Sequence, residues 1–231
     1  MIPFAAAVAS GVLASYWTPG PESRSYIQHF AAGVVLAAVT GELLPKVVES
    51  GQHVPGAIFG FVAGLIVMLG IKLLSHATEK SGGQGGPSPL GLSVTAGVDT
   101  LVDGLVIGLG FVVGGGAGPL LALALGVELF FLALSAAGSV GQSGKSRWWM
   151  IGIGVGLGVL VMIGALGGVT LLGGAPEALV IAVLAFGSIA LLYLVTEELL
   201  VSIRSVSETP WHTLALFAGF ILVFVIEMLI Y

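Results

Sequence analysis

Long apolar runs broken by short polar stretches dominate the pattern along the chain. A helix needs about 20 apolar residues to cross a bilayer, and runs of that length recur from end to end. The pattern predicts eight membrane-spanning helices, with approximate ranges 2–17, 27–48, 54–75, 90–113, 118–140, 148–173, 177–203 and 211–230. The first run is short, but it lacks the basic start and the cleavage site of a signal peptide.

Between the third and fourth ranges, residues 76–89 are rich in Gly, Ser and Pro. This composition is typical of a flexible loop, which we expect on the cytoplasmic side. Two tryptophans, Trp148 and Trp149, begin the sixth range and predict an anchor at the membrane interface. No second domain is expected, so residues 1–231 form one transmembrane domain.

Composition places the chain among integral membrane proteins of the all-α class. The sequence is 57% hydrophobic and only 8% charged, and its mean hydropathy is +1.12, whereas soluble domains are about a quarter charged. The absence of cysteine excludes disulfides and thiolate metal sites, and the net charge of −5 offers no basic patch for nucleic acid. No nucleotide loop, nucleophile–base pair or cofactor motif is visible, so we expect neither an enzyme nor a resident cofactor.

The positions of the cations predict an orientation. With eight spans, all cations but one fall on one side: Arg24, Lys72, Lys80, Lys145, Arg147 and Arg204. Only Lys46 falls on the other side, which also carries both termini. Cytoplasmic loops are enriched in Lys and Arg. We therefore expect a multi-pass protein of the cell membrane with both termini outside.

Two carboxylates lie within the fourth span. Asp99 and Asp103 are four positions apart, so a helix stacks them on one face. Glu128 lies near the middle of the fifth span, at a comparable depth. Acids out of water repel each other and pay for desolvation, so such a group persists when it is protonated, hydrated or bound to a cation. Intramembrane acids most often mark ion or proton pathways.

Spans two and seven carry similar acidic elements. Glu42 precedes Leu-Leu-Pro, and Glu197 and Glu198 precede Leu-Leu, each after an apolar run. Because one span runs outward and the other inward, these acids are expected at opposite depths, as in an inverted repeat. They are candidates for pathway or gate groups. Glu227 and His212, near the ends of span eight, are expected to be solvated.

These features resemble the ZIP family of divalent-metal transporters. The similarity covers most of the chain: eight spans, external termini and a long cytoplasmic loop after span three. Asp99, Thr100, Asp103 and Gly104 resemble the family's His-Asn-x-x-(Asp/Glu)-Gly motif in span four. Glu128 corresponds to an acid of the span-five motif, whereas Glu42, Glu197 and Glu198 stand where the elements ending in Leu-Leu-Pro carry His or His-Glu.

The departures from the family pattern reduce the expected site. Asp99 replaces a histidine, and Val127, Phe130 and Phe131 replace a ligand, the proline and the second glutamate of span five. The resemblance thus implies one metal position, formed by Asp99, Asp103 and Glu128 with Thr100 as a weak ligand. Oxygen donors alone suit Mg²⁺, Mn²⁺ or Ca²⁺ better than imidazole-preferring metals.

The sequence thus predicts transport of divalent cations of the zinc, iron and manganese class into the cytoplasm. A proton-coupled carrier of another solute remains an alternative, as does a protein of the same fold that does not transport. The expected partners are the divalent cation, the lipid bilayer and, given the small-residue helix faces, a second copy of the chain in a homodimer.

Overall fold

The computed structural model describes residues 2–17, 20–51, 53–81, 89–114, 116–142, 144, 146–199 and 209–230. Helices make up nearly all of this part, which contains no strand: α1 (Ile2–Ala14), α2 (Pro21–Ala38), the π-helix η1 (Val39–Leu43), α3 (Leu44–Glu49), α4 (Val54–Ser81), α5 (Pro89–Val113), α6 (Ala117–Gln142), α7 (Arg147–Leu172), α8 (Glu177–Tyr193), the π-helix η2 (Leu194–Leu199) and α9 (Pro210–Ile230). The predicted all-α class is confirmed.

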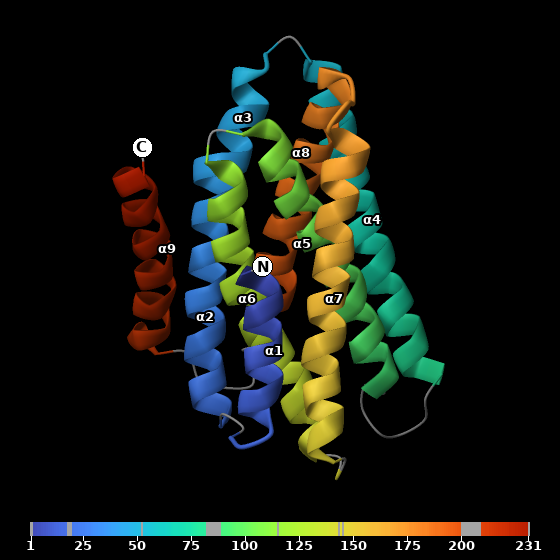
Figure 1. The fold of residues 1–231 in the computed structure, drawn as a ribbon, viewed down its shortest axis with the longest axis vertical. Coiled ribbons are helices and arrows are strands. Elements are labelled where there is room, and N and C mark those ends of the chain that lie inside the picture. Colours follow the sequence, from blue (N-terminus) through green and yellow to red (C-terminus); the bar gives the residue numbers. More distant parts are fainter. Residues whose placement is uncertain are drawn as a thin grey trace.

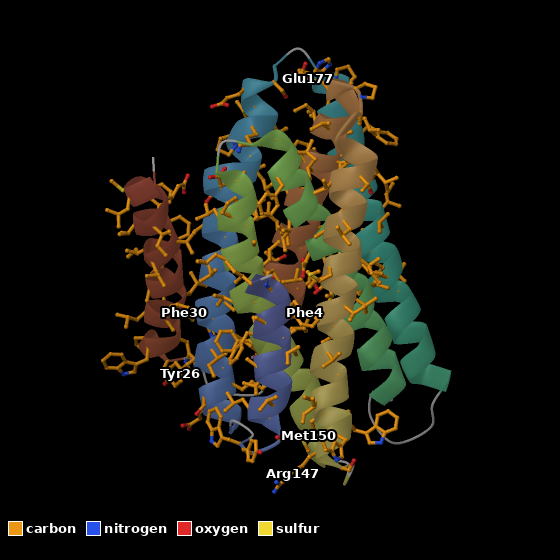
Figure 2. All side chains as sticks on the ribbon, viewed as in Figure 1. Phe4, Tyr26, Phe30, Arg147, Met150 and Glu177 are labelled. Carbon is orange, nitrogen blue, oxygen red and sulfur yellow. The ribbon has the colours of Figure 1, made fainter. Side chains whose placement is uncertain are left out.

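The long helices run up and down between two ends of one bundle (Figure 1). The upper end holds the turns after α3, α5 and α7, and Glu177 marks it in Figure 2. The lower end holds the turns after α1 and α6, and Arg147 marks it in the same view. Within the described residues, seven helices are long and apolar enough to cross a membrane, which makes this a multi-pass membrane protein.

The first predicted span is shorter than expected. α1 has 13 residues, or about 20 Å at 1.5 Å per residue, against about 30 Å of hydrocarbon in a bilayer. It begins beside Gly126, near the middle of α6, and packs along the lower half of the bundle (Figure 1). The expected range 2–17 is corrected to Ile2–Ala14, since the chain turns at 15–16.

Part of the predicted flexible loop is helical. α4 continues to Ser81, so residues 76–81 extend the third span, and α5 begins at Pro89. His-Ala-Thr-Glu-Lys has no Gly or Pro to stop a helix, whereas the Gly-rich stretch comes only after Ser81. The prediction of a loop at 82–88 lies outside the described residues.

Helix pairs that run in the same direction pack most closely: α5 with α7, α2 with α9, α4 with α8, and α1 with α6. Glycines permit this approach. A Cβ on Gly104 or Gly108 would overlap the backbone carbonyls of Val161 or Ala165 on α7. Small residues of this kind allow helices to pack in lipid, where no hydrophobic force drives them together.

The outer helices present apolar side chains to the surroundings. Phe59 and Ile66 on α4, Leu166 on α7, and Phe217 and Leu229 on α9 are all mostly exposed. A water-soluble bundle would not expose bands of this size, so these faces fit contact with lipid.

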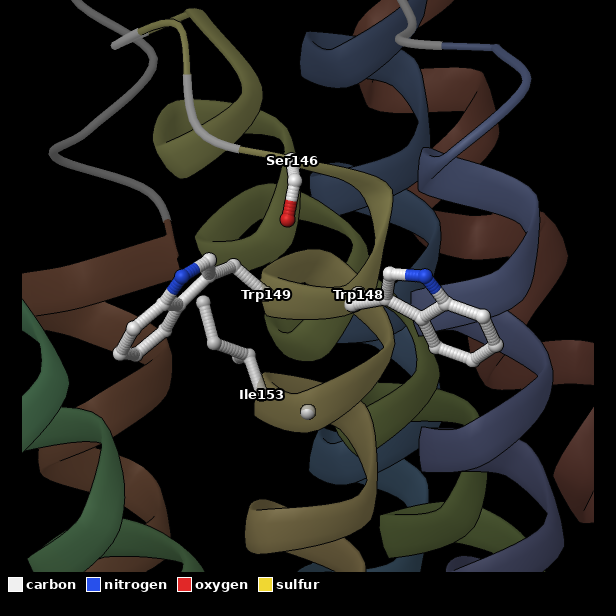
Figure 3. A pocket seen from close by; sticks show the side chains of 5 residues that line it. Ser146, Trp148, Trp149 and Ile153 are labelled. Atoms are coloured by element: carbon white, nitrogen blue, oxygen red, sulfur yellow. The ribbon is translucent and has the colours of Figure 1, made fainter.

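All four tryptophans of the sequence are exposed. Trp17 follows α1, whereas Trp148 and Trp149 lie in the first turn of α7 and Trp211 in the first turn of α9, so all four lie toward the lower end. A shallow groove runs beside Trp148, Trp149 and Ile153 (Figure 3). Tryptophan rings favour the level of lipid headgroups, so this placement is the one expected for an end that lies at a membrane interface.

The expected inverted repeat is visible in the packing. A Cβ on Gly64 of α4 would meet the carbonyl of Phe186 on α8, and one on Gly219 of α9 would meet the carbonyl of Phe30 on α2. α8 and α2 run in opposite directions (Figure 1). The pair α4–α8 therefore repeats the pair α9–α2 upside down, with Gly64 matching Gly219.

The repeat extends through the two π-helices. Aligning Phe30 with Phe186 brings Val39-Thr40-Gly41-Glu42-Leu43-Leu44 opposite Val195-Thr196-Glu197-Glu198-Leu199-Leu200. η1 lies within the first segment, and η2, which begins one residue earlier at Leu194, overlaps the second. Thr40 and Thr196 each donate to the carbonyl four residues earlier. π-helical turns inside longer helices occur often at functional sites, and here both contain the acids singled out from the sequence.

Candidate metal centre

Asp99, Asp103 and Glu128 form one compact group, which we call the carboxylate triad. One oxygen of each residue can be chosen so that all three lie within 4.8 Å of one another. The side chains are buried, with Asp99 7%, Asp103 1% and Glu128 2% exposed. The residues predicted from spans four and five are therefore brought together as expected.

Local helix geometry explains how two helices build this group. Asp99 and Asp103 stack one turn apart on α5. α5 and α6 form an antiparallel hairpin, in which Gly110 approaches Gly118 closely near the turn. Asp103 lies nearly as many residues before the turn as Glu128 lies after it. The hairpin therefore places both residues at about the same depth, near the middle of the bundle.

When ionised, the three carboxylates of the triad repel one another strongly. Two unit charges 4.8 Å apart interact with about 3 kcal/mol at an effective dielectric constant of about 20. With three such pairs, full ionisation would oppose folding unless a cation were present. The site can therefore hold protons, a divalent cation, or exchange one for the other. Its donors are all oxygen atoms, which suit hard or borderline cations.

Thr100 is fully buried, but its hydroxyl faces its own helix. Oγ1 donates to the carbonyl of Ala96 at 2.7 Å, the usual hydrogen bond of a threonine inside a helix. Because Thr100 is next to Asp99 on the helix, its side chain points about 100° away from that of Asp99. The role of Thr100 as a weak ligand stays a prediction.

Glu42 lies toward the upper end, within η1, and is only 3% exposed. Lys46 forms an ion pair with it, with Nζ 3.0 Å from Oε2, and also donates to the carbonyl of Gly114 at 3.2 Å. In the sequence, Lys46 served only to predict the orientation in the membrane, and its pairing with Glu42 was not predicted. The two residues are four positions apart on a helix, a spacing that indicates such an ion pair.

Glu227 is half-buried and lies against Gly41 of η1, where a Cβ would overlap its carboxylate. The expectation that Glu227 is solvated is therefore wrong. α9 packs lengthwise on α2, so the side of α9 that carries Glu227 faces protein, whereas position in the sequence suggested only a helix near the C-terminus.

Glu197 lies in η2 toward the lower end and forms an ion pair with Lys72 of α4. The Lys72 ammonium also lies 6.0 Å from the centre of the Tyr193 ring. Both charged side chains are more than a third exposed, so this pair is hydrated. The side chain of Glu198 lies outside the described residues. Neither Glu42 nor Glu197 belongs to the triad, and their role on a pathway stays a prediction.

His212 is buried, which corrects the expectation of a solvated side chain. It is 3% exposed, and its ring stacks on Tyr26 with centroids 4.2 Å apart. Nδ1 accepts the backbone N–H of Thr209 at 3.0 Å, so this histidine caps the first turn of α9. His29 lies beside it, with ring centroids 5.0 Å apart.

Comparison with known proteins adds no assignment: no family model matches the chain, and no curated protein matches it significantly.

Proposed function

We propose that the protein is a transporter of divalent cations that binds its substrate at the carboxylate triad. The observation that carries this proposal is the meeting of Asp99, Asp103 and Glu128 within 4.8 Å, buried in a bundle of membrane-spanning helices. Charged groups are costly at that depth. A divalent cation offsets the repulsion of three carboxylates better than any neutral ligand.

The donor set favours particular cations. Mn²⁺, Mg²⁺ and Ca²⁺ accept shells made of carboxylate, carbonyl and water oxygens, whereas zinc sites usually include imidazole or thiolate. We therefore propose Mn²⁺ first among the zinc, iron and manganese class. The resemblance to ZIP transporters points the same way, and a ZIP-like role remains part of the proposal.

The positions of the cations support an orientation of the protein in the membrane. Arg24, Lys72 and Arg147 lie toward the lower end and Lys46 toward the upper end. The positive-inside rule assigns the lower end to the cytoplasm, so we propose the cell membrane as location and the C-terminus outside. Inward transport from the upper end is proposed from the resemblance to ZIP transporters. Transport needs no chemical conversion, and the proposal assigns no enzyme activity.

Uptake into proteoliposomes tests the proposal. Wild-type protein should take up Mn²⁺ in a saturable way, and Asp103→Asn should abolish uptake while keeping the shape of the side chain. Glu177→Gln removes a carboxylate that is 73% exposed at the upper end and serves as the matched control, which should transport normally.

The alternatives give different results in the same vesicles. A proton-coupled carrier would show solute flux that follows a pH gradient without any metal, because the triad would then exchange protons. A protein of this fold that does not transport would show neither flux. Absence of metal uptake by folded wild-type protein would overturn the metal-transport proposal.

A further inference from the structure

Lys46 connects two parts of the upper end that are far apart in sequence. Its ammonium contacts Glu42 on its own helix and the carbonyl of Gly114. Gly114 directly follows α5 and opens the turn to α6, with φ of 75°, a conformation that glycine adopts without strain. One lysine therefore ties α3 to the turn of the helix hairpin that carries the carboxylate triad.

The surroundings of Lys46 are acidic and largely dry. Glu42 is buried, and the Glu227 carboxylate lies over Gly41, the residue just before Glu42 in η1. Two carboxylates therefore lie near the one ammonium that pairs with Glu42, and with all three groups ionised the cluster keeps a charge of −1. Such a cluster attracts a further cation.

The inverted repeat shows how the two ends differ. Lys72 lies as far beyond Gly64 on α4 as Glu227 lies beyond Gly219 on α9, so the two residues are equivalent. At the lower end the α4 residue is a cation, which pairs with Glu197 of η2. At the upper end the equivalent residue is an acid, which cannot form an ion pair with η1.

Among the described residues, Lys46 is therefore the lysine that pairs with the acid of η1. The lower end is joined by a bond between two helices, Lys72 to Glu197. Beside η1, the ion pair of Lys46 with Glu42 lies within one helix, and Lys46 also donates a hydrogen bond to the carbonyl of Gly114 on the hairpin that carries the triad. A lysine side chain is long and flexible, so it can leave this position without unfolding a helix.

We propose that Lys46 is a latch released by the substrate cation. A divalent cation that arrives at the upper end replaces the ammonium beside Glu42 and Glu227, because its double charge suits two carboxylates better. Lys46 then releases Gly114, and the α5–α6 turn becomes free to move relative to α3. The inference rests on the proposed function, since the cation that opens the latch is the one that is transported.

A single engineered thiol can report on the latch. The chain has no cysteine, and Ala117, the first residue of α6 beside the turn, is 1% exposed. In the Ala117→Cys protein, a water-soluble thiol reagent should react slowly. Adding Lys46→Met should speed labelling about tenfold, as expected for loss of a charged hydrogen bond. Mn²⁺ should speed labelling similarly in the Lys46 protein and have no further effect with Lys46→Met.

Two controls separate the latch from general damage. Lys46→Arg keeps the charge and the donor, so labelling should stay slow. Lys72→Met removes the lysine at the other end and should leave labelling of Cys at 117 unchanged. Equal labelling with Lys46 and Lys46→Met would overturn the latch, as would faster labelling with Lys72→Met.

The test is independent of transport. Asp103→Asn should abolish Mn²⁺ uptake but still allow Mn²⁺ to speed labelling, because the latch lies above the triad. If folded wild-type protein takes up no metal, the proposed function fails. If Mn²⁺ also leaves labelling unchanged, release by the cation is refuted, even where Lys46→Met speeds the reaction.

Discussion

Neutralising Asp103 should change the stability of the protein in opposite directions without and with metal. In the metal-free state, Asp103→Asn removes one of three like charges that lie within 4.8 Å. Each pair contributes about 3 kcal/mol of repulsion at an effective dielectric constant of about 20 when both members are ionised. Shared protons reduce this value, so we expect a stabilisation of about 1–3 kcal/mol.

The same substitution should abolish stabilisation by metal. Loss of about 3 kcal/mol of attraction corresponds to an affinity about 100-fold lower. The assay is thermal unfolding in detergent, followed with and without Mn²⁺ for wild type, Asp103→Asn and Asp99→Asn. Wild type should melt at a higher temperature as Mn²⁺ increases, because a ligand that binds only the folded state stabilises it.

One result would refute this reasoning. If Asp103→Asn destabilises the metal-free protein and retains the full Mn²⁺ shift, the carboxylates are not a repelling group held for a cation. They would then be protonated side chains that serve the structure through hydrogen bonds. Glu177→Gln, on the exposed upper surface, should leave both the metal-free melting temperature and the shift unchanged.

Three further predictions concern the fold. Gly104→Leu should destabilise the bundle by about 1–3 kcal/mol or prevent folding, because the new side chain would overlap α7. A side chain at Gly156 would meet nothing within 4 Å, so Gly156→Leu should melt like wild type. Thermal unfolding of the two variants makes the comparison. Lys72→Glu should lower the melting temperature only slightly, since the pair with Glu197 is hydrated. A second change, Glu197→Lys, should restore it in a double-mutant cycle, and failure to restore would exclude a direct pair. Fluorescence of the four tryptophans should be quenched more by spin labels at headgroup depth than at the bilayer centre, and the reverse order would contradict the position of the lower end at an interface.

The sequence predicted most of the fold because a bilayer leaves few options. Apolar runs of spanning length must become helices, since every backbone polar group needs a partner within lipid. The ends of two helices differ from the prediction. α4 continues to Ser81 through polar residues that are good helix formers, and α1 is too short to span the bilayer. Neither feature changes the apolar pattern from which the helices were predicted.

The candidate site was predictable in part. Asp99 and Asp103 share a face because of their spacing on one helix, which is a local property. The approach of Glu128 depends on the hairpin of α5 and α6, and its depth could be estimated from the sequence because the turn between them is short. The three oxygens lie within 4.8 Å of one another because side chains from two packed helices meet. The spacing of residues in the sequence does not give this distance.

Only the tertiary structure decided which residues meet at the two ends. Lys46 and Gly114, and Glu227 and Gly41, are neighbours because α3 meets the α5–α6 turn and α9 lies along α2. Helices in lipid gain little from hydrophobicity when they associate, so their partners depend on shape, glycine contacts and a few polar bonds. The sequence alone determined that the chain crosses a membrane as helices and carries acids within it, because local chemistry sets both. Packing between helices determined which acids gather in the centre and which are matched by lysines at the ends.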